Sequence, residues 1–260
     1  MAIDLQDLLR DLEQEGTQLE VVLKGIGPRD WDRPTPAPGW TVRHQVAHLM
    51  WTDEALLAAL REPERFSRLA AEVAAAPATV DKAALERGAA SVSELSARWA
   101  AGRRAVAAAL AGLPPSRRIP WIGPPMGAAM AASARIMETF AHGQDIRDAL
   151  GIAPAASPRL RHVAHLAVAA RDFAFRSRGL TPPAEPFRIE LGYDGESWVW
   201  GPEDAAQRVA GEALDFALLA TRRRHRADCQ VSALGADADQ WLDIAQAYAG
   251  DPGAGRQPRS

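Results

Sequence analysis

Three side chains able to bind a metal ion stand at helical spacing in METFAHGQDIRDAL, residues 137–150. Glu138, His142 and Asp145 occupy positions i, i+4 and i+7, which lie on one side of an α-helix. The preceding GAAMAASARI is rich in small residues, which would let a second helix approach and leave room for an ion or a ligand. Such a line of polar groups is either a solvated surface or a site for chemistry.

Two further histidines, His44 and His48, are four residues apart in RHQVAHL. His48 lies beside the leucine stripe of its segment, on a face that can point towards another helix. If it meets Glu138 and His142, two imidazoles and one carboxylate would bind a metal and leave a fourth position open, as catalytic zinc requires. Asp145 could then accept the other ring N–H of His142 and fix its tautomer. The alternative is a surface pair of Glu138 and His142, worth ~0.2–0.5 kcal/mol. We expect His44 to be a satisfied helix histidine.

The other candidate groups give weaker signals. His162 and His165 have no carboxylate in register, and we expect packing or surface roles for both. His225 lies in the basic run TRRRHRAD at the end of a predicted helix, where the helix dipole favours cations. Anion binding by Arg222 to Arg226 is the alternative. We interpret Cys229 as a buried thiol.

Composition limits the classes of function. The chain has 260 residues, 47% hydrophobic and 24% charged, which is typical of a globular protein. Its net charge of −3 argues against a nucleic-acid partner bound by bulk electrostatics. The single cysteine excludes an internal disulfide and a cysteine-based zinc site. Neither a signal peptide nor a run of ~18 apolar residues is present, so we expect a cytoplasmic protein with no membrane partner.

The first half of the chain predicts helices joined by rigid loops. Leucines at a seven-residue step indicate an amphipathic helix over 3–27, and RPTPAPG at 33–39 must be a loop. A second helix over 41–61 would be capped by Thr41, and a short helical piece should cover 64–76. Asp81 could cap a long helix over 82–113. The segment 114–125 is a predicted loop, and the fourth long helix, 127–150, should end at Gly151.

The second half changes character. A helix is expected over 158–178, followed by a linker that ends at 186. PFRIEL and ESWVW, separated by a turn with Asp-Gly, predict a β-hairpin. Helices are expected near 203–209 and 212–224, a third strand at 229–235 and a closing helix at 241–250. The prediction is therefore a mainly α protein with a four-helix bundle over 1–180, a small α+β domain over 181–250 and a disordered tail over 251–260.

The segment PAPGWTVRHQVAHLMWTDEAL resembles the opening of the mycothiol-dependent maleylpyruvate isomerase family, part of the DinB-like metal-binding bundle superfamily. The resemblance implies that His48 is a metal ligand, and METFAHGQD matches the Glu and His of a later helix with Glu138 and His142. It covers the first 150 residues, and the family also has a small C-terminal α+β domain. His44 is additional to the family pattern.

A subgroup of uncharacterised actinobacterial metal-binding proteins is more similar still. Some of their C-terminal parts bear a label for wyosine base formation. That label carries little weight, because the acidic balance does not suit tRNA binding and the chain has no cysteine cluster for radical chemistry.

The resemblance implies that a divalent metal, usually zinc, holds the thiol of mycothiol. The thiolate would add to a cis-enoate such as maleylpyruvate, the new single bond would rotate, and elimination would give the trans isomer; with another substrate the thiolate would be transferred. Arg222 could bind a substrate carboxylate through two hydrogen bonds. The expected partners are thus a small thiol and a small electrophilic or carboxylate substrate, and a homodimer is open. The alternatives are a hydrolase that uses a metal-bound water and a protein whose metal is not catalytic.

Overall fold

The computed structural model describes residues 4–251 and 253–259. The chain divides into two compact units, Met1–Ala153 and Pro154–Ser260. The sequence placed this boundary near residue 180 instead. The difference arises because α7 (Leu160–Ala169) and α8 (Arg171–Arg176) pack on elements of the second unit.

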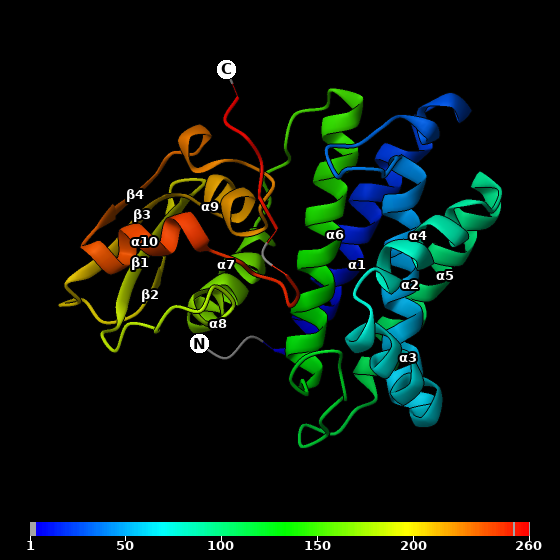
Figure 1. Ribbon diagram of the computed structural model, residues 1–260, viewed down its shortest axis with the longest axis horizontal. Coiled ribbons are helices and arrows are strands. Elements are labelled where there is room, and N and C mark those ends of the chain that lie inside the picture. Colours follow the sequence, from blue (N-terminus) through cyan, green and yellow to red (C-terminus); the bar gives the residue numbers. More distant parts are fainter. Residues whose placement is uncertain (1–3, 252, 260) are drawn as a thin grey trace. The chain divides into compact units, whose positions relative to one another are not determined.

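The first unit is built on four long helices, α1 (Leu5–Lys24), α2 (Val42–Arg61), α5 (Val92–Ala111) and α6 (Ala128–Leu150) (Figure 1). Helix α2 packs against α5 and α6, and α1 packs against the same two helices. A buried apolar cluster joins them; its members include Leu19, Leu49, Met50, Trp99 and Ile146. The shorter helices α3 (Pro63–Ala75) and α4 (Thr79–Gly88) lie against α2, and a 3₁₀ turn, Pro28–Asp32, precedes the proline-rich loop. The predicted helical bundle is confirmed.

The long helix expected over 82–113 is two helices, and that prediction was wrong. Helix α4 begins at Thr79, before Asp81, and ends at Gly88. Helix α5 starts anew after Ser91, whose hydroxyl oxygen accepts a hydrogen bond from the backbone N–H of Glu94 at 3.2 Å. Ser-x-x-Glu is a capping-box pattern, and this local signal outweighed the continuous alanine-rich periodicity.

Gly88, the last residue of α4, lies against the side chain of His44 on α2. A Cβ atom at this position would lie 2.4 Å from Cδ2 of His44 on α2. Only glycine allows the end of α4 to approach the start of α2 so closely. Gly151, with φ of 69°, ends α6 in the left-handed conformation, as predicted.

The second unit combines a four-stranded mixed sheet with helices. Its strands β1 (Phe187–Tyr193), β2 (Glu196–Trp200), β3 (Gln207–Glu212) and β4 (Val231–Leu234) lie in the order β2-β1-β3-β4 (Figure 1). Strand β1 pairs antiparallel with β2 and parallel with β3, and β3 pairs antiparallel with β4. Helices α9 (Ala213–Ala220) and α10 (Ala236–Ile244) contact the sheet, α7 (Leu160–Ala169) packs on α9, and α8 (Arg171–Arg176) packs on α10.

Several local predictions in this unit need correction. The helix expected over 203–209 is absent: residues 203–206 form a turn and a bend, and strand β3 begins at Gln207. In β3, Val209 is buried and a Cβ at Gly211 would lie 2.2 Å from the carbonyl oxygen of Gln230. The strand pairing therefore decides the conformation there. The helix expected over 158–178 is interrupted at Ala170, and the closing helix runs over Ala236–Ile244 instead of 241–250. The hairpin and the third predicted strand are confirmed.

The tail has neither helix nor strand at residues 251 and 253–259, and the backbone N–H of Arg259 donates to the Asp228 carboxylate. Its predicted disorder stays a prediction, and residues 252 and 260 lie outside the described chain. Over the described ranges, no helix is both long enough and apolar enough to cross a bilayer.

Candidate metal centre

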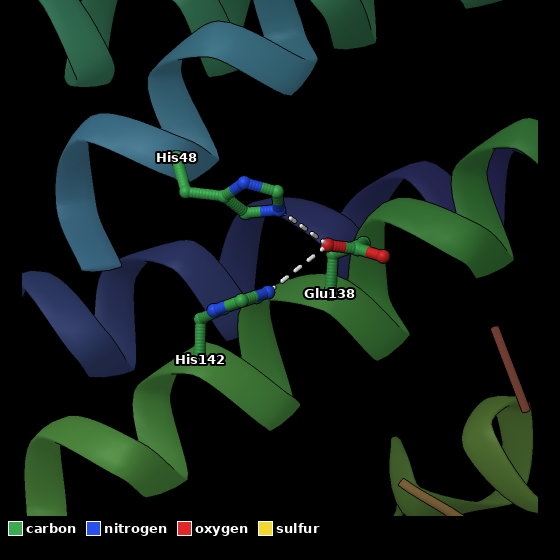
Figure 2. Close-up of side chains that lie close together, drawn as sticks. All are labelled: His48, Glu138 and His142. Atoms are coloured by element: carbon green, nitrogen blue, oxygen red, sulfur yellow. Dashed lines mark hydrogen bonds and ion pairs between the residues drawn. The ribbon is translucent and has the colours of Figure 1, made fainter. Parts of the chain in front are cut away.

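Helices α2 and α6 bring His48, Glu138 and His142 together inside the first unit (Figure 2). Nε2 of His48 lies 3.2 Å from Oε2 of Glu138, and Nε2 of His142 lies 3.3 Å from the same oxygen. The other carboxylate oxygen points away from both rings (Figure 2). Among the residues that the structure describes, this is the only group of three or more His, Cys, Asp or Glu whose ligand atoms lie within 4.8 Å of one another. The convergence predicted from the sequence is confirmed.

The spacing of these atoms suits a tetrahedral ion. Zinc binds His nitrogen and carboxylate oxygen at about 2.0–2.1 Å, so neighbouring ligands of a tetrahedral ion are about 3.3 Å apart. The two nitrogen–oxygen distances match that separation. Two imidazoles and one carboxylate also form the donor set of catalytic zinc sites with an open fourth position. The residues present therefore fit a zinc-like divalent metal.

Charge at the cluster also favours a cation. Burial raises the pKa of Glu138, but hydrogen bonds from His142 and His48 outweigh it and hold the pKa well below its ordinary value. The carboxylate is therefore ionised at neutral pH. Each imidazole must place a proton on Nε2 to donate to this oxygen, or a metal ion must take the place of those protons.

Two tryptophans enclose the imidazoles. The Trp40 ring centroid lies 5.3 Å from that of His48 and 6.0 Å from that of His142, and Trp51 lies 5.9 Å from His48. The side chains of the three candidate ligands are 10–22% exposed. An ion bound here would be held among apolar rings, where its attraction to the carboxylate is stronger than in bulk water.

Gln45 is a residue of the site that the sequence reasoning missed. Its side chain is fully buried, and its Oε1 lies 2.6 Å from Nδ1 of His142. This is the position beside the second ring nitrogen that we expected for Asp145. Asp145 is itself fully buried in α6, and its assignment as a catalytic residue stays a prediction. The available signal was the i to i+3 spacing of Gln45 and His48, which puts both on one face of α2.

His44 caps its helix and does not join the metal cluster. Its Nδ1 accepts the backbone N–H of Thr41 at 3.1 Å, while Thr41 caps the third residue of α2 in return. Burial, aided by the positive charge of Arg43, lowers the pKa of His44. The lowered pKa favours the neutral ring, in which Nδ1 carries no proton and can accept this hydrogen bond. The prediction of a satisfied helix histidine is confirmed.

We expect His44→Ala to lower the free energy of unfolding by about 1 kcal/mol, as the loss of a helix cap does. Zinc affinity should stay within about twofold, because the cap is separate from the ligands. Urea denaturation and zinc calorimetry on the same preparation measure the two effects. A variant that loses zinc in proportion to the other histidine variants would contradict this assignment.

A buried ion pair between Asp53 and Arg135, next to the metal cluster, connects α2 to α6. Nε of Arg135 on α6 donates to Oδ1 of Asp53 on α2 at 2.9 Å, and Nη2 donates to the carbonyl oxygen of Leu49 at 3.3 Å. Both charged side chains are at most 4% exposed. Asp53 and Arg135 follow His48 and precede Glu138 by less than two turns. This ion pair therefore fixes the register in which the ligands meet.

Arg222 lies in the second unit, just after α9, in the left-handed conformation with φ of 62°. Its Nη1 donates to the carbonyl oxygen of Asp243 in α10 at 3.0 Å. Arg226 of the same basic run forms ion pairs with Asp239 and Asp243. Arg222 and Arg226 thus bind protein oxygens of α10, and the carboxylate-binding role of Arg222 stays a prediction. In the same unit, His165 accepts from the indole of Trp200 at 3.3 Å.

Cys229 is poorly suited to nucleophilic chemistry. Its thiol donates to the carbonyl oxygen of His225 at 3.4 Å. Burial, together with the negative charges of Asp215 and Asp228, raises the pKa of Cys229 to about 12. The thiolate is the reactive form, so the only sulfhydryl of the chain stays protonated at neutral pH.

Alkylation of Cys229 by iodoacetamide at pH 8 should accordingly be at least ~100-fold slower in the native protein than in the urea-unfolded chain. The raised pKa reduces the thiolate fraction at any pH below 12. The rate should therefore still be rising steeply above about pH 10, where an ordinary thiol is almost fully ionised and its rate has levelled off. Mass spectrometry of timed samples gives both rates, and equal rates would contradict the assignment.

Comparison with known proteins places this site in a family. Residues 12–147, which contain all three candidate ligands, match the model of the mycothiol maleylpyruvate isomerase N-terminal domain. The chain belongs to this family. The residues that match the mycothiol maleylpyruvate isomerase N-terminal domain family lie within the first unit. Residues 183–233 match a second model, described as wyosine base formation.

Similar whole proteins exist in Mycobacterium tuberculosis. Uncharacterised proteins of the strains CDC 1551 / Oshkosh and ATCC 25618 / H37Rv are each 49% identical over 248 residues, which cover 95% of this chain and 96% of theirs. Both units of this chain are therefore shared with these relatives.

A solved structure shares the fold. The crystal structure of the mycothiol-dependent maleylpyruvate isomerase superposes with a TM-score of 0.62 at 14% identity, covering 89% of this chain and 93% of that one. A histidine-to-alanine variant of the same enzyme gives 0.61 over the same shares. At this identity the likeness extends to the architecture of the family member and not to its activity.

Proposed function

We propose that this protein is a metal-dependent enzyme that activates a low-molecular-weight thiol of the mycothiol type. The thiol would add to a small electrophilic substrate. With a maleylpyruvate-type enoate the addition would lead to isomerisation, and with another electrophile the thiol would remain bound to the product. The observation that carries the proposal is the convergence of His48, Glu138 and His142 on one point at the distances of tetrahedral zinc ligands.

The chain itself would do three things at this site. His48, Glu138 and His142 would hold the ion and leave one position open. A bound zinc ion would favour the thiolate form of a coordinated thiol at neutral pH. Trp40 and Trp51 would exclude water around the imidazoles, and the ionised Glu138 would balance part of the metal charge.

The reactive sulfur would come from outside the chain. Cys229 is the only cysteine, and its pKa of about 12 removes it as a nucleophile. This supports a diffusible thiol as cosubstrate. We retain Arg222 as the proposed carboxylate-binding residue, since one of its guanidinium nitrogens is engaged with a backbone carbonyl and a guanidinium has further N–H groups to offer.

Calorimetry with purified mycothiol tests this function. We expect mycothiol to bind the zinc-loaded protein at least ~10-fold more tightly than the metal-free protein, because coordination needs the ion. S-methyl mycothiol is the matched control, since it has no ionisable thiol, and it should bind equally to both forms. Equal binding of mycothiol to both forms would overturn the proposal. Zinc-dependent ester hydrolysis without any thiol would favour the hydrolase instead.

A further inference from the structure

We propose that Gln45 is a positioning residue of the metal centre, which holds His142 in the tautomer that presents Nε2 to the ion. The orientation of Gln45 is set in turn by Thr35 in the proline-rich loop. This inference rests on the proposed metal-binding function. It links the loop at 33–40 to the site through three consecutive hydrogen bonds.

The direction of these hydrogen bonds is fixed by the group at the loop end of the relay, the backbone carbonyl of Trp40. The carbonyl oxygen of Trp40 can only accept, so the hydroxyl of Thr35, 2.9 Å away, must donate to it. The hydroxyl has one hydrogen, so its oxygen accepts from any further neighbour. Nε2 of Gln45 lies 2.9 Å from that oxygen and donates to it. The amide of Gln45 is therefore oriented with its NH₂ group towards the loop.

This orientation leaves Oε1 of Gln45 facing His142. An amide oxygen accepts only, so Nδ1 of His142, at 2.6 Å, must carry a hydrogen. In the neutral ring, Nε2 then has its lone pair directed towards Oε2 of Glu138, 3.3 Å away. Two lone pairs repel at that distance, so either a second ring hydrogen on Nε2 or a metal ion must lie between them. The relay thus prepares His142 as a ligand before any ion arrives.

His48 lacks such a relay, which makes Gln45 specific to one ligand. Among the described residues, Nδ1 of His48 is buried without a hydrogen-bond partner. The ring is held by packing between Trp40 and Trp51. Trp40 stacks on His142 at an interplanar angle of 24°, and the centroid of the His48 ring lies 4.3 Å from that of His142. The hydrogen bond that Gln45 accepts from Nδ1 of His142 therefore orients this ring, in addition to the ring packing that orients His48.

The loop is rigid enough to impose this orientation. The backbone N–H of Thr35 also donates to the carbonyl of Trp40 at 2.8 Å, and Pro34 and Thr41 form a β-bridge. Gln45 is fully buried, so reversing its amide would leave two buried polar groups facing the wrong partners. The loop thus contacts the metal centre in two ways: the Trp40 ring packs on the imidazoles, and Thr35 orients the amide of Gln45.

Two substitutions at position 45 separate orientation from packing. Gln45→Met keeps the volume but removes the acceptor, and we expect zinc affinity to fall about 10- to 100-fold, the range for lost partners of a ligating histidine. Gln45→Glu keeps an acceptor for Nδ1–H and should bind zinc within about threefold of wild type or more tightly. Thr35→Val removes the hydroxyl and should give a smaller loss, with Thr35→Ser restoring it. Competition with a chelator measures each affinity.

Nitrogen NMR of the metal-free protein adds a readout that does not depend on zinc. The chemical shifts should show the hydrogen of neutral His142 on Nδ1 in wild type and in Thr35→Ser, and a mixed tautomer in Gln45→Met. A neutral wild-type ring with its hydrogen on Nε2 and none on Nδ1 would overturn the relay even if Gln45→Met does not fold. Equal zinc affinities of Gln45→Met and wild type, or equal losses in Gln45→Met and Gln45→Glu, would overturn it too. A wild type that binds no zinc but shows the Nδ1–H tautomer would reject the proposed function while leaving the hydrogen-bond relay in place.

Discussion

Glu138→Ala should abolish stoichiometric zinc in the purified protein and weaken zinc affinity by more than about 100-fold, beyond the effect of losing an outer partner of a ligand. The carboxylate oxygen is the atom on which both imidazoles converge, at 3.2 and 3.3 Å. Its removal takes away the negative charge and one of three ligands together. Elemental analysis gives the stoichiometry, and chelator competition gives the affinity.

Controls for this experiment come from the same two helices. His48→Ala and His142→Ala should lose zinc to a similar extent, whereas His44→Ala, one turn earlier on α2, should retain it. Zinc should also raise the melting temperature of wild type, because an ion that binds only the folded state stabilises it. Full zinc content in all three ligand variants would show that no metal is held at this cluster.

Asp53→Ala should cost about 3–5 kcal/mol of unfolding free energy, because it leaves the guanidinium of Arg135 buried without its counter-charge. A guanidinium cannot lose its proton at accessible pH, so the chain has no way to relieve the cost. The double variant Asp53→Leu with Arg135→Met should recover most of the loss, since both charges are then gone. Urea denaturation at pH 7 measures all of these values.

Arg135→Met should behave differently with pH. Burial already raises the pKa of Asp53, with the charge of Arg135 acting against it, so removing Arg135 raises that pKa further. A folded-state pKa above the unfolded value means that stability falls as pH rises through that interval. The variant should therefore be closest to wild type in acid and lose stability towards neutral pH.

An exposed ion pair serves as the control for the buried pair of Asp53 and Arg135. Arg65 and Glu62 form an ion pair with both side chains more than half exposed, and Arg65→Met should change stability by less than about 1 kcal/mol at any pH. Losses of equal size at the buried and the exposed pair would contradict the role of Asp53 and Arg135 in fixing the helix register.

The types of the candidate ligands and their spacing within each helix could be predicted from the sequence, but the contact between the ligands of α2 and α6 could not. The i, i+4 relation of Glu138 and His142 is a property of one helix and was predictable. The position of His48 opposite them depends on the register of α2 against α6, and only the resemblance to a family supplied it. Gln45 was missed because a buried amide on an apolar helix is recognised only once its neighbours from the loop and from α6 are known.

Local competition explains the errors in the fold. The alanine-rich periodicity over 82–113 predicted one continuous helix, although Ser91 and Glu94 form a capping pattern at which a new helix begins. Strand β3 was missed because its residues have no strong strand preference and are held by pairing with β1 and β4, which lie far away in sequence. Boundaries that depend on such non-local pairing cannot be derived from a sequence window.

The inertness of Cys229 has a consequence for the cell. Under the proposed function, oxidants would not disable the protein by capping its own sulfur, because that sulfur stays protonated and occupied with a backbone carbonyl. Turnover would instead follow the supply of reduced small thiol. Oxidative stress would thus slow the reaction by draining the cosubstrate, and flux would resume as soon as that reservoir was replenished, without any repair of the polypeptide.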